Sequence, residues 1–194
     1  RKTIQDLTGE LIELLDVLGI DRFDVIGFSW GTLAELALLA RVPQRIRRAG
    51  FLGPMLPSRF LPTRDLERMK PDVRLSLRMA GRVPALHRGL MWLVCRLPVA
   101  ALMNQFKDEQ LSAAEARALA PGSDFAGHLS RSIEECIRTG SRFFTDGWRM
   151  FLDEPGYTLG DLAAVASTVR VRFYVGERDN VHLPSNASML AAAC

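Results

Sequence analysis

One serine in this sequence has neighbours that would let its hydroxyl act as a nucleophile. Ser29 is the centre of Gly27–Phe28–Ser29–Trp30–Gly31, a Gly-x-Ser-x-Gly pentapeptide. A serine hydroxyl is a weak nucleophile until a base accepts its proton, so it must face both a base and an acyl carbon. A sharp strand-to-helix turn presents the hydroxyl in this way, but it brings the strand and helix backbones close together. The residues two before and two after the serine must therefore be small, and Gly27 and Gly31 meet this requirement. We therefore expect Ser29 to have a positive φ angle, which serine rarely adopts.

The residue after the serine has a second chemical use. A helix that begins at this turn points its N-terminus at the site, so the backbone N–H of Trp30 could donate a hydrogen bond to a developing oxyanion. The structural alternative is a glycine-rich turn in which Ser29 only caps the helix.

The segments around Ser29 have the periodicities that such a turn requires. Apolar residues at helical spacing predict a helix over residues 4–18, and a short buried strand follows at 23–28. Residues 30–41 are strong helix formers that Pro43 ends, and a second strand is expected at 46–52. Helices and strands that alternate with short links predict right-handed crossovers and a parallel sheet.

The character of the sequence changes between residues 55 and 160. Prolines there separate short amphipathic stretches, at about 71–80, 84–96, 111–120 and 127–152, and none of them reads as a strand. A third strand is expected at 169–175, and the residues from 185 to the end of the chain predict the start of a further helix.

Residues 23–57 and 165–194 resemble the α/β-hydrolase superfamily, and the segment between them resembles its helical cap. The resemblance rests on the pentapeptide in its strand-to-helix context and on Gly176–Glu177–Arg178–Asp179–Asn180–Val181–His182–Leu183–Pro184. This run is similar to the family's Gly-x-x-Asp-x-x-x-Pro, with the proline slightly displaced. In that family the aspartate after the seventh strand orients the catalytic histidine, which implies Asp179 as the acid. Glu177, which is closer to the strand, is the competing acid, and an Asx-turn at the strand end is the structural alternative for Asp179.

The catalytic histidine is harder to assign. The resemblance implies the order serine, acid, histidine, with the histidine after an eighth strand. Of the three histidines, His87 and His128 lie in the cap-like segment, and His182 follows Asp179 by only three residues. His182 would need an unusual bend to reach Ser29, so it is only a weak candidate for the base, and His87 and His128 are expected to be ordinary packing or surface residues. We expect the base and the first oxyanion donor to lie outside these 194 residues, and the chain alone to hydrolyse activated esters poorly.

Composition excludes several other classes of function. Hydrophobic residues make up 48% of the chain and charged residues 24%, with a net charge of +3, as in ordinary globular proteins. The short basic run at 45–48 has no interleaved aromatics, so nucleic acid is not expected as a partner. Cys95, Cys136 and Cys194 have no metal-ligand spacing, and we expect buried reduced thiols, no metal and no cofactor. No apolar run is long enough to span a membrane, and a cytoplasmic protein of undetermined oligomeric state is expected.

These observations lead to one prediction of fold and function. The fold is α/β: a partial parallel sheet with flanking helices over residues 1–54 and 161–194, and an inserted helical cap over 55–160. The function is that of a serine hydrolase that transfers an acyl group from a small ester-like molecule to water, with thioester, amide and C–C substrates left open. A non-catalytic member that binds a ligand or a protein in the same fold is the alternative. In the catalytic case, one imidazole should be able to bridge Ser29 and Asp179.

Overall fold

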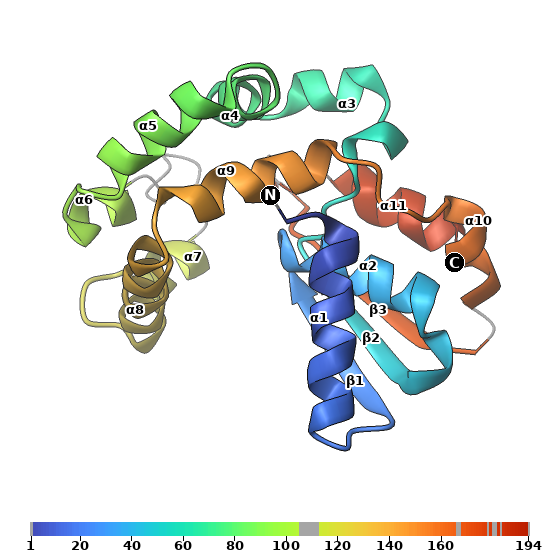
Figure 1. Cartoon of the computed structure of the whole chain (residues 1–194). Helices are drawn as coiled ribbons and strands as arrows, with labels where there is room; N and C mark the ends of the chain where they lie inside the picture. Colours follow the sequence, from blue (N-terminus) through green and yellow to red (C-terminus); the bar gives the residue numbers. More distant parts are fainter. Residues whose placement is uncertain are drawn as a thin grey trace. The chain divides into compact units, whose positions relative to one another are not determined.

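The computed structural model describes residues 2–104, 113–165, 168–177, 179, 182 and 184–193 (Figure 1). The chain divides into two compact units. The first contains Arg1–Arg82 together with Asp146–Cys194, and the second contains Val83–Thr145.

The first unit contains a parallel sheet of three strands. They are β1 (Phe23–Phe28), β2 (Ile46–Leu52) and β3 (Arg170–Tyr174), in the order β1-β2-β3. Gly27 of β1 is in register with Phe51 of β2, and Phe51 is in register with Phe173 of β3. All three predicted strands are therefore confirmed, together with their parallel direction.

Four helices of the first unit lie close to the sheet or to one another (Figure 1). They are α1 (Ile4–Val17), α2 (Gly31–Arg41), α10 (Leu159–Val165) and α11 (Pro184–Ala193). α2 packs against β1 and β2 and also contacts α1 and α10, while α11 contacts α10 and β3. Apolar side chains from these elements form a buried core with the inward-facing residues of the sheet, among them Leu36, Leu39, Phe51, Leu162 and Leu190. This core packs α2 against β1 and β2, next to the turn where β1 passes into α2.

Local sequence signals account for the helix ends near the sheet. Thr3 caps α1 through a capping box with Asp6, and the chain leaves that helix at Gly19, which has a φ of 66°. Pro43 opens the 3₁₀ turn η1 (Pro43–Arg45) that separates α2 from β2. The helices predicted at 4–18 and 30–41 are confirmed within one residue at each end.

In its described residues, the segment between β2 and β3 contains helices joined by turns and loops, and no strand. In the first unit it contains η2 (Ser58–Phe60), α3 (Thr63–Arg68) and α4 (Pro71–Arg82). In the second unit it contains α5 (Pro84–Val94), α6 (Val99–Asn104), α7 (Ala113–Ala118) and α8 (Asp124–Arg138). α9 (Ser141–Leu152) begins in the second unit and ends in the first.

Three expectations for this segment need correction. The stretch predicted as one helix at 127–152 is two helices, because the chain turns at Gly140 with a φ of 86°. The short helices α3, α6 and α10 were not expected, since six or seven residues carry little periodicity. Cys95 and Cys136 are free thiols, but they are half-buried rather than buried. Cys194 and residues 111–112, the start of a predicted helix, lie outside the described residues. The cap boundaries of 55–160 stay a prediction.

Candidate active site

Ser29 lies at the junction of β1 and α2, as the pentapeptide predicts. Its φ is 52°, the one positive φ angle at a non-glycine residue among those described. Two backbone hydrogen bonds hold the strained turn: Ser29 N–H donates to the carbonyl of Leu52 at 3.1 Å, and the Ser29 carbonyl accepts from Thr32 N–H at 3.0 Å. The neighbouring strand and the first turn of α2 thus both restrain the serine.

The two glycines of the pentapeptide differ in what they do. A Cβ on Gly27 would lie 3.0 Å from the backbone N and Cα of Thr32 and 2.4 Å from Glu35 Oε2, so only glycine fits there. Apart from its chain neighbours and the backbone of α2, a Cβ on Gly31 would meet no atom of the described residues within 4 Å. The expected need for a small residue is confirmed at Gly27 and is wrong at Gly31, which lies on the exposed start of α2.

Asp179 lies in the turn that follows β3. Its backbone N–H donates to the Gly176 carbonyl at 3.1 Å, and its Oδ1 accepts from the backbone N–H of His182 at 2.7 Å. The second oxygen, Oδ2, lies 3.0 Å from His182 Nδ1. The Asp179 carboxylate therefore both accepts from the backbone N–H three residues further on and orients an imidazole, whereas Glu177 is exposed.

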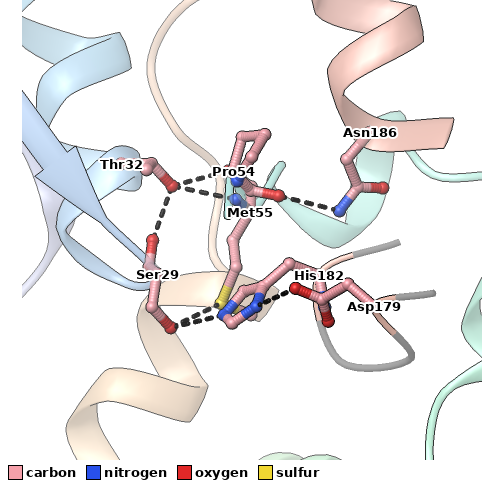
Figure 2. A network of polar contacts seen from close by, with 7 residues as sticks. All are labelled: Ser29, Thr32, Pro54, Met55, Asp179, His182 and Asn186. Carbon is pink, nitrogen blue, oxygen red and sulfur yellow. Dashed lines mark hydrogen bonds and ion pairs between the residues drawn. The ribbon is translucent and has the colours of Figure 1, made fainter. Parts of the chain in front are cut away.

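His182 lies between Ser29 and Asp179, contrary to expectation (Figure 2). Its Nε2 is 2.9 Å from Ser29 Oγ, while Nδ1 faces the carboxylate. Because an ionised carboxylate can only accept, Nδ1 carries the proton and Nε2 is left to accept from the serine hydroxyl. The expectation that the bend after Asp179 keeps His182 away from Ser29 is thus wrong. This arrangement can take up the serine proton and stabilise the resulting imidazolium.

The space for the His182 ring comes from a glycine at the end of β2. Gly53 has a φ of 53°, and a Cβ there would lie 3.0 Å from both Cγ and Nδ1 of His182. On another side, the ring centroid of Phe28 is 5.9 Å from that of His182. The side chain of His182 is 13% exposed and that of Asp179 is 23% exposed, so the pair is shielded but not sealed from solvent.

A second set of polar contacts holds the loop after β2 next to the serine (Figure 2). The hydroxyl of Thr32 lies 2.6 Å from the Ser29 carbonyl, and it accepts from Met55 N–H at 2.9 Å. Asn186 of α11 donates through Nδ2 to the Pro54 carbonyl at 3.1 Å, and Met55 Sδ lies 3.7 Å from Ser29 Oγ. Thr32, Met55 and Asn186 could not be identified from the sequence, because nothing in their spacing connects the three segments.

Glu35 is a buried carboxyl group close to the elbow. It is 1% exposed, and its Oε1 accepts from Gly50 N–H at 3.1 Å. Burial raises the pKa of Glu35 to about 8, although the backbone N–H groups of Gly27 and Gly50 act in the opposite direction. Glu35 is therefore predominantly neutral at pH 7.

The other two histidines lie in the second unit. His87 is fully buried, its Nδ1 is 3.0 Å from Thr145 Oγ1, and burial lowers its pKa. His128 is exposed and pairs with Arg131. Both contacts fit the ordinary packing and surface roles expected for these residues.

The described residues include no group of three or more His, Cys, Asp or Glu side chains that could hold a metal ion. In the same residues, no helix combines the length and the apolar character needed to cross a bilayer.

Comparisons with known proteins agree with the geometry of the fold. A family model described as alpha/beta hydrolase fold matches residues 5–126. No curated protein sequence matches the chain.

Three solved structures illustrate the likeness in three dimensions. An enol-lactonase from Burkholderia xenovorans LB400 is 18% identical with a TM-score of 0.58, and the match covers 99% of this chain and 61% of that one. A serine hydrolase from Cycloclasticus zankles is 19% identical with a TM-score of 0.55, covering 98% of this chain and 59% of that one. A variant of the meta-cleavage product hydrolase from Pseudomonas fluorescens IP01 is 14% identical with a TM-score of 0.54, covering 100% and 60%. This chain thus spans about 60% of the length of these neighbours.

Proposed function

Because the chain belongs to the alpha/beta hydrolase fold family, we propose that it catalyses acyl transfer from an ester-like substrate to water through Ser29. In this proposal His182 is the general base, Asp179 orients it, and Trp30 N–H donates to the oxyanion. The observation that supports it most directly is the imidazole that lies 2.9 Å from Ser29 Oγ and 3.0 Å from Asp179 Oδ2.

The first half of the reaction forms an acyl-enzyme. Ser29 Oγ attacks the acyl carbon while its proton passes to His182 Nε2, and Asp179 stabilises the imidazolium. The carbonyl oxygen becomes an oxyanion that accepts a hydrogen bond from Trp30 N–H at the start of α2. When the tetrahedral intermediate collapses, the bond to the leaving alkoxide breaks, and the alkoxide takes the proton from His182.

The second half releases the acid. A water molecule takes the place of the leaving alcohol and gives a proton to His182 Nε2 as its oxygen attacks the acyl carbon. The new tetrahedral intermediate then breaks its bond to Ser29 Oγ, which recovers the proton from His182. The products are a carboxylic acid, an alcohol and the unchanged enzyme.

The substrate class follows from the nucleophile and from the surroundings of the elbow. Serine rather than aspartate at position 29 favours acyl substrates over alkyl halides and epoxides. The Met55 thioether lies 3.7 Å from the reacting hydroxyl, and the Trp30 indole contacts that of Trp148 in α9 edge-on, with the ring centroids 5.1 Å apart. We propose that the segment 55–160 acts as the cap and that its apolar side chains favour an apolar acyl group. The names of two neighbours, an enol-lactonase and an esterase, are consistent with an ester substrate.

The test is covalent labelling of Ser29 by a fluorophosphonate, run alongside hydrolysis of p-nitrophenyl acetate. We expect a measurable second-order labelling rate in the unmodified chain, because His182 supplies the base. Ser29→Ala should abolish labelling, and His182→Ala and Asp179→Asn should each slow it at least about 10²-fold. With Trp30 as the single assigned oxyanion donor, absolute turnover should lie about 10²–10³-fold below that of an enzyme with two donors.

His128→Ala provides the matched control. It removes an exposed imidazole in the second unit and should leave the labelling rate unchanged. An unmodified chain that is folded but not labelled at Ser29 would contradict the proposal and favour the non-catalytic alternative. Equal labelling of the wild type and His182→Ala would remove His182 from the mechanism while leaving Ser29 in place.

A further inference from the structure

Thr32 has more hydrogen-bond partners than its position in α2 requires. Its side chain is fully buried, so the hydroxyl must find partners inside the protein. The Oγ1 donates to the Ser29 carbonyl at 2.6 Å, a contact with the third residue back that helical threonines often make. The same oxygen also accepts from Met55 N–H at 2.9 Å and lies 3.2 Å from the Met55 carbonyl. These last contacts join α2 to the loop after β2 (Figure 2).

The carbonyl that Thr32 binds belongs to the peptide unit that provides the assigned oxyanion donor. The Ser29 carbonyl and the Trp30 N–H are the two ends of one planar amide. A hydrogen bond that fixes the direction of the carbonyl therefore also fixes the direction of the N–H. It also polarises the amide, and a polarised amide is a stronger donor.

The rest of the network holds the Thr32 hydroxyl in place. The hydroxyl has one proton, and we assign it to the Ser29 carbonyl because that acceptor is at 2.6 Å and the Met55 carbonyl is at 3.2 Å. Met55 N–H occupies a lone pair of the same oxygen. The loop that provides this N–H is itself held by Asn186 of α11, which is buried and donates to the Pro54 carbonyl. The chain of contacts thus runs from α11 through the loop after β2 to the amide at the elbow.

We propose that Thr32 is a positioning residue for the reaction, because its hydroxyl orients and polarises the Ser29–Trp30 amide whose N–H stabilises the oxyanion. The proposal rests on the function proposed above and adds a residue that does not touch the substrate. It predicts that the Thr32 hydroxyl contributes to kcat more than to KM, because the oxyanion exists only in the transition state and the intermediates.

The experiment compares two variants that differ only in the hydroxyl. Thr32→Ser and Thr32→Ala both lack the methyl group, but serine keeps the oxygen. We expect Thr32→Ser to label with fluorophosphonate within about 3-fold of the wild type, and Thr32→Ala to label about 10- to 100-fold more slowly, part of the 10²–10³ that loss of a whole donor costs. With p-nitrophenyl acetate, the loss should appear in kcat while KM changes by less than about 3-fold.

The outcomes distinguish a failure of this inference from a failure of the proposed function. If the wild type is labelled at Ser29 and Thr32→Ala matches Thr32→Ser, the positioning role is wrong and the proposed function stands. If the wild type is not labelled at all, the proposed function fails and the inference fails with it. Thermal melting of both variants checks folding, and Thr32→Val, which keeps the volume without the hydroxyl, replaces Thr32→Ala if the alanine variant does not fold. A loss of kcat that serine does not restore would also overturn the proposal.

Discussion

Glu35 occupies the space that the missing side chain of Gly27 leaves open. Its Oε2 lies 2.4 Å from the place of a Cβ on Gly27, and its Oε1 accepts from Gly50 N–H on the next strand. The group is 1% exposed, and among the residues that the structure describes Oε2 has no hydrogen-bond partner. A carboxylate there would be a buried charge without a counter-ion, which explains why burial raises the pKa to about 8.

This raised pKa predicts a pH-dependent stability. The folded protein holds the Glu35 proton up to about pH 8, whereas the ordinary value of 4.5 applies to the unfolded chain. The folded state therefore binds more protons between these values, and the free energy of unfolding should fall as the pH rises from about 4.5 to 8. Glu35→Gln replaces the carboxyl group with an uncharged isostere and should remove this slope, with a gain of at most roughly 5 kcal/mol above pH 8.

Urea unfolding of the wild type and Glu35→Gln from pH 5 to pH 9 measures the difference. Glu13→Gln, which removes an exposed carboxyl group from α1, serves as the control and should leave the slope unchanged. Parallel stability curves for the wild type and Glu35→Gln across this range would show that Glu35 is ionised in the folded protein.

The helix α9 comes close to the nucleophile elbow at Gly147, a residue without a side chain. A Cβ on Gly147 would lie 2.8 Å from two carbons of the Trp30 ring, and the next residue, Trp148, contacts the same ring edge-on. The Trp30 indole thus packs against α9 at Gly147 and Trp148. The glycine is required here by packing, since in the middle of a helix it lowers stability relative to alanine.

Gly147→Ala should therefore destabilise the protein despite the better helix propensity of alanine. We expect a loss of about 1–3 kcal/mol from overpacking against Trp30. Gly89→Ala is the matched control, because a Cβ at that position of α5 meets no atom within 4 Å and should be neutral or stabilising by up to about 1 kcal/mol. Denaturant unfolding of both variants measures the change in the free energy of unfolding. If Gly147→Ala is as stable as Gly89→Ala, the close approach of α9 is not a constraint.

At the scale of the whole chain, the sheet buries one face and exposes apolar side chains on the other. Ile26 is 72% exposed, Phe28 68% and Tyr174 52%, all on residues that alternate with inward-facing neighbours along their strands. β1 and β3 are also the outer strands of the three-stranded sheet, so each has one edge that pairs with no other strand of that sheet. Exposed apolar strands with open edges promote association between chains.

We expect Ile26→Lys to reduce concentration-dependent self-association without a large loss of stability. A charge on the exposed face of the outer strand β1 opposes edge-to-edge pairing, and the side chain that it replaces is mostly in solvent. Light scattering across a concentration series gives the readout. Leu14→Lys removes an apolar side chain of α1 that is 53% exposed and should have little effect. Equal effects of the two substitutions would show that general hydrophobicity, not the sheet face, drives association.

The fold class and half of the candidate site follow from local signals in the sequence. Strand, glycine, serine and helix are adjacent along the chain, so the β1–α2 turn and the positive φ of Ser29 could be predicted without any long-range contact. Asp179 was implied by the resemblance to the α/β-hydrolase superfamily, and its place after the third strand brings it near Ser29 because the carboxyl ends of parallel strands meet at one edge of a sheet. Helix boundaries in the segment 55–160 were less predictable, as the division at Gly140 shows.

Tertiary structure decided what the remaining polar groups contact. The three residues from Asp179 to His182 specify a short turn but not its direction, and the ring reaches Ser29 because Gly53, 129 residues earlier, leaves room for it. Thr32, Met55 and Asn186 come from three segments that have no common sequence pattern, and Glu35 looks like an ordinary helix residue until β1 and β2 bury it. Periodicity and turn residues report backbone conformation, whereas the partner of a buried side chain depends on which distant backbone lies beside it.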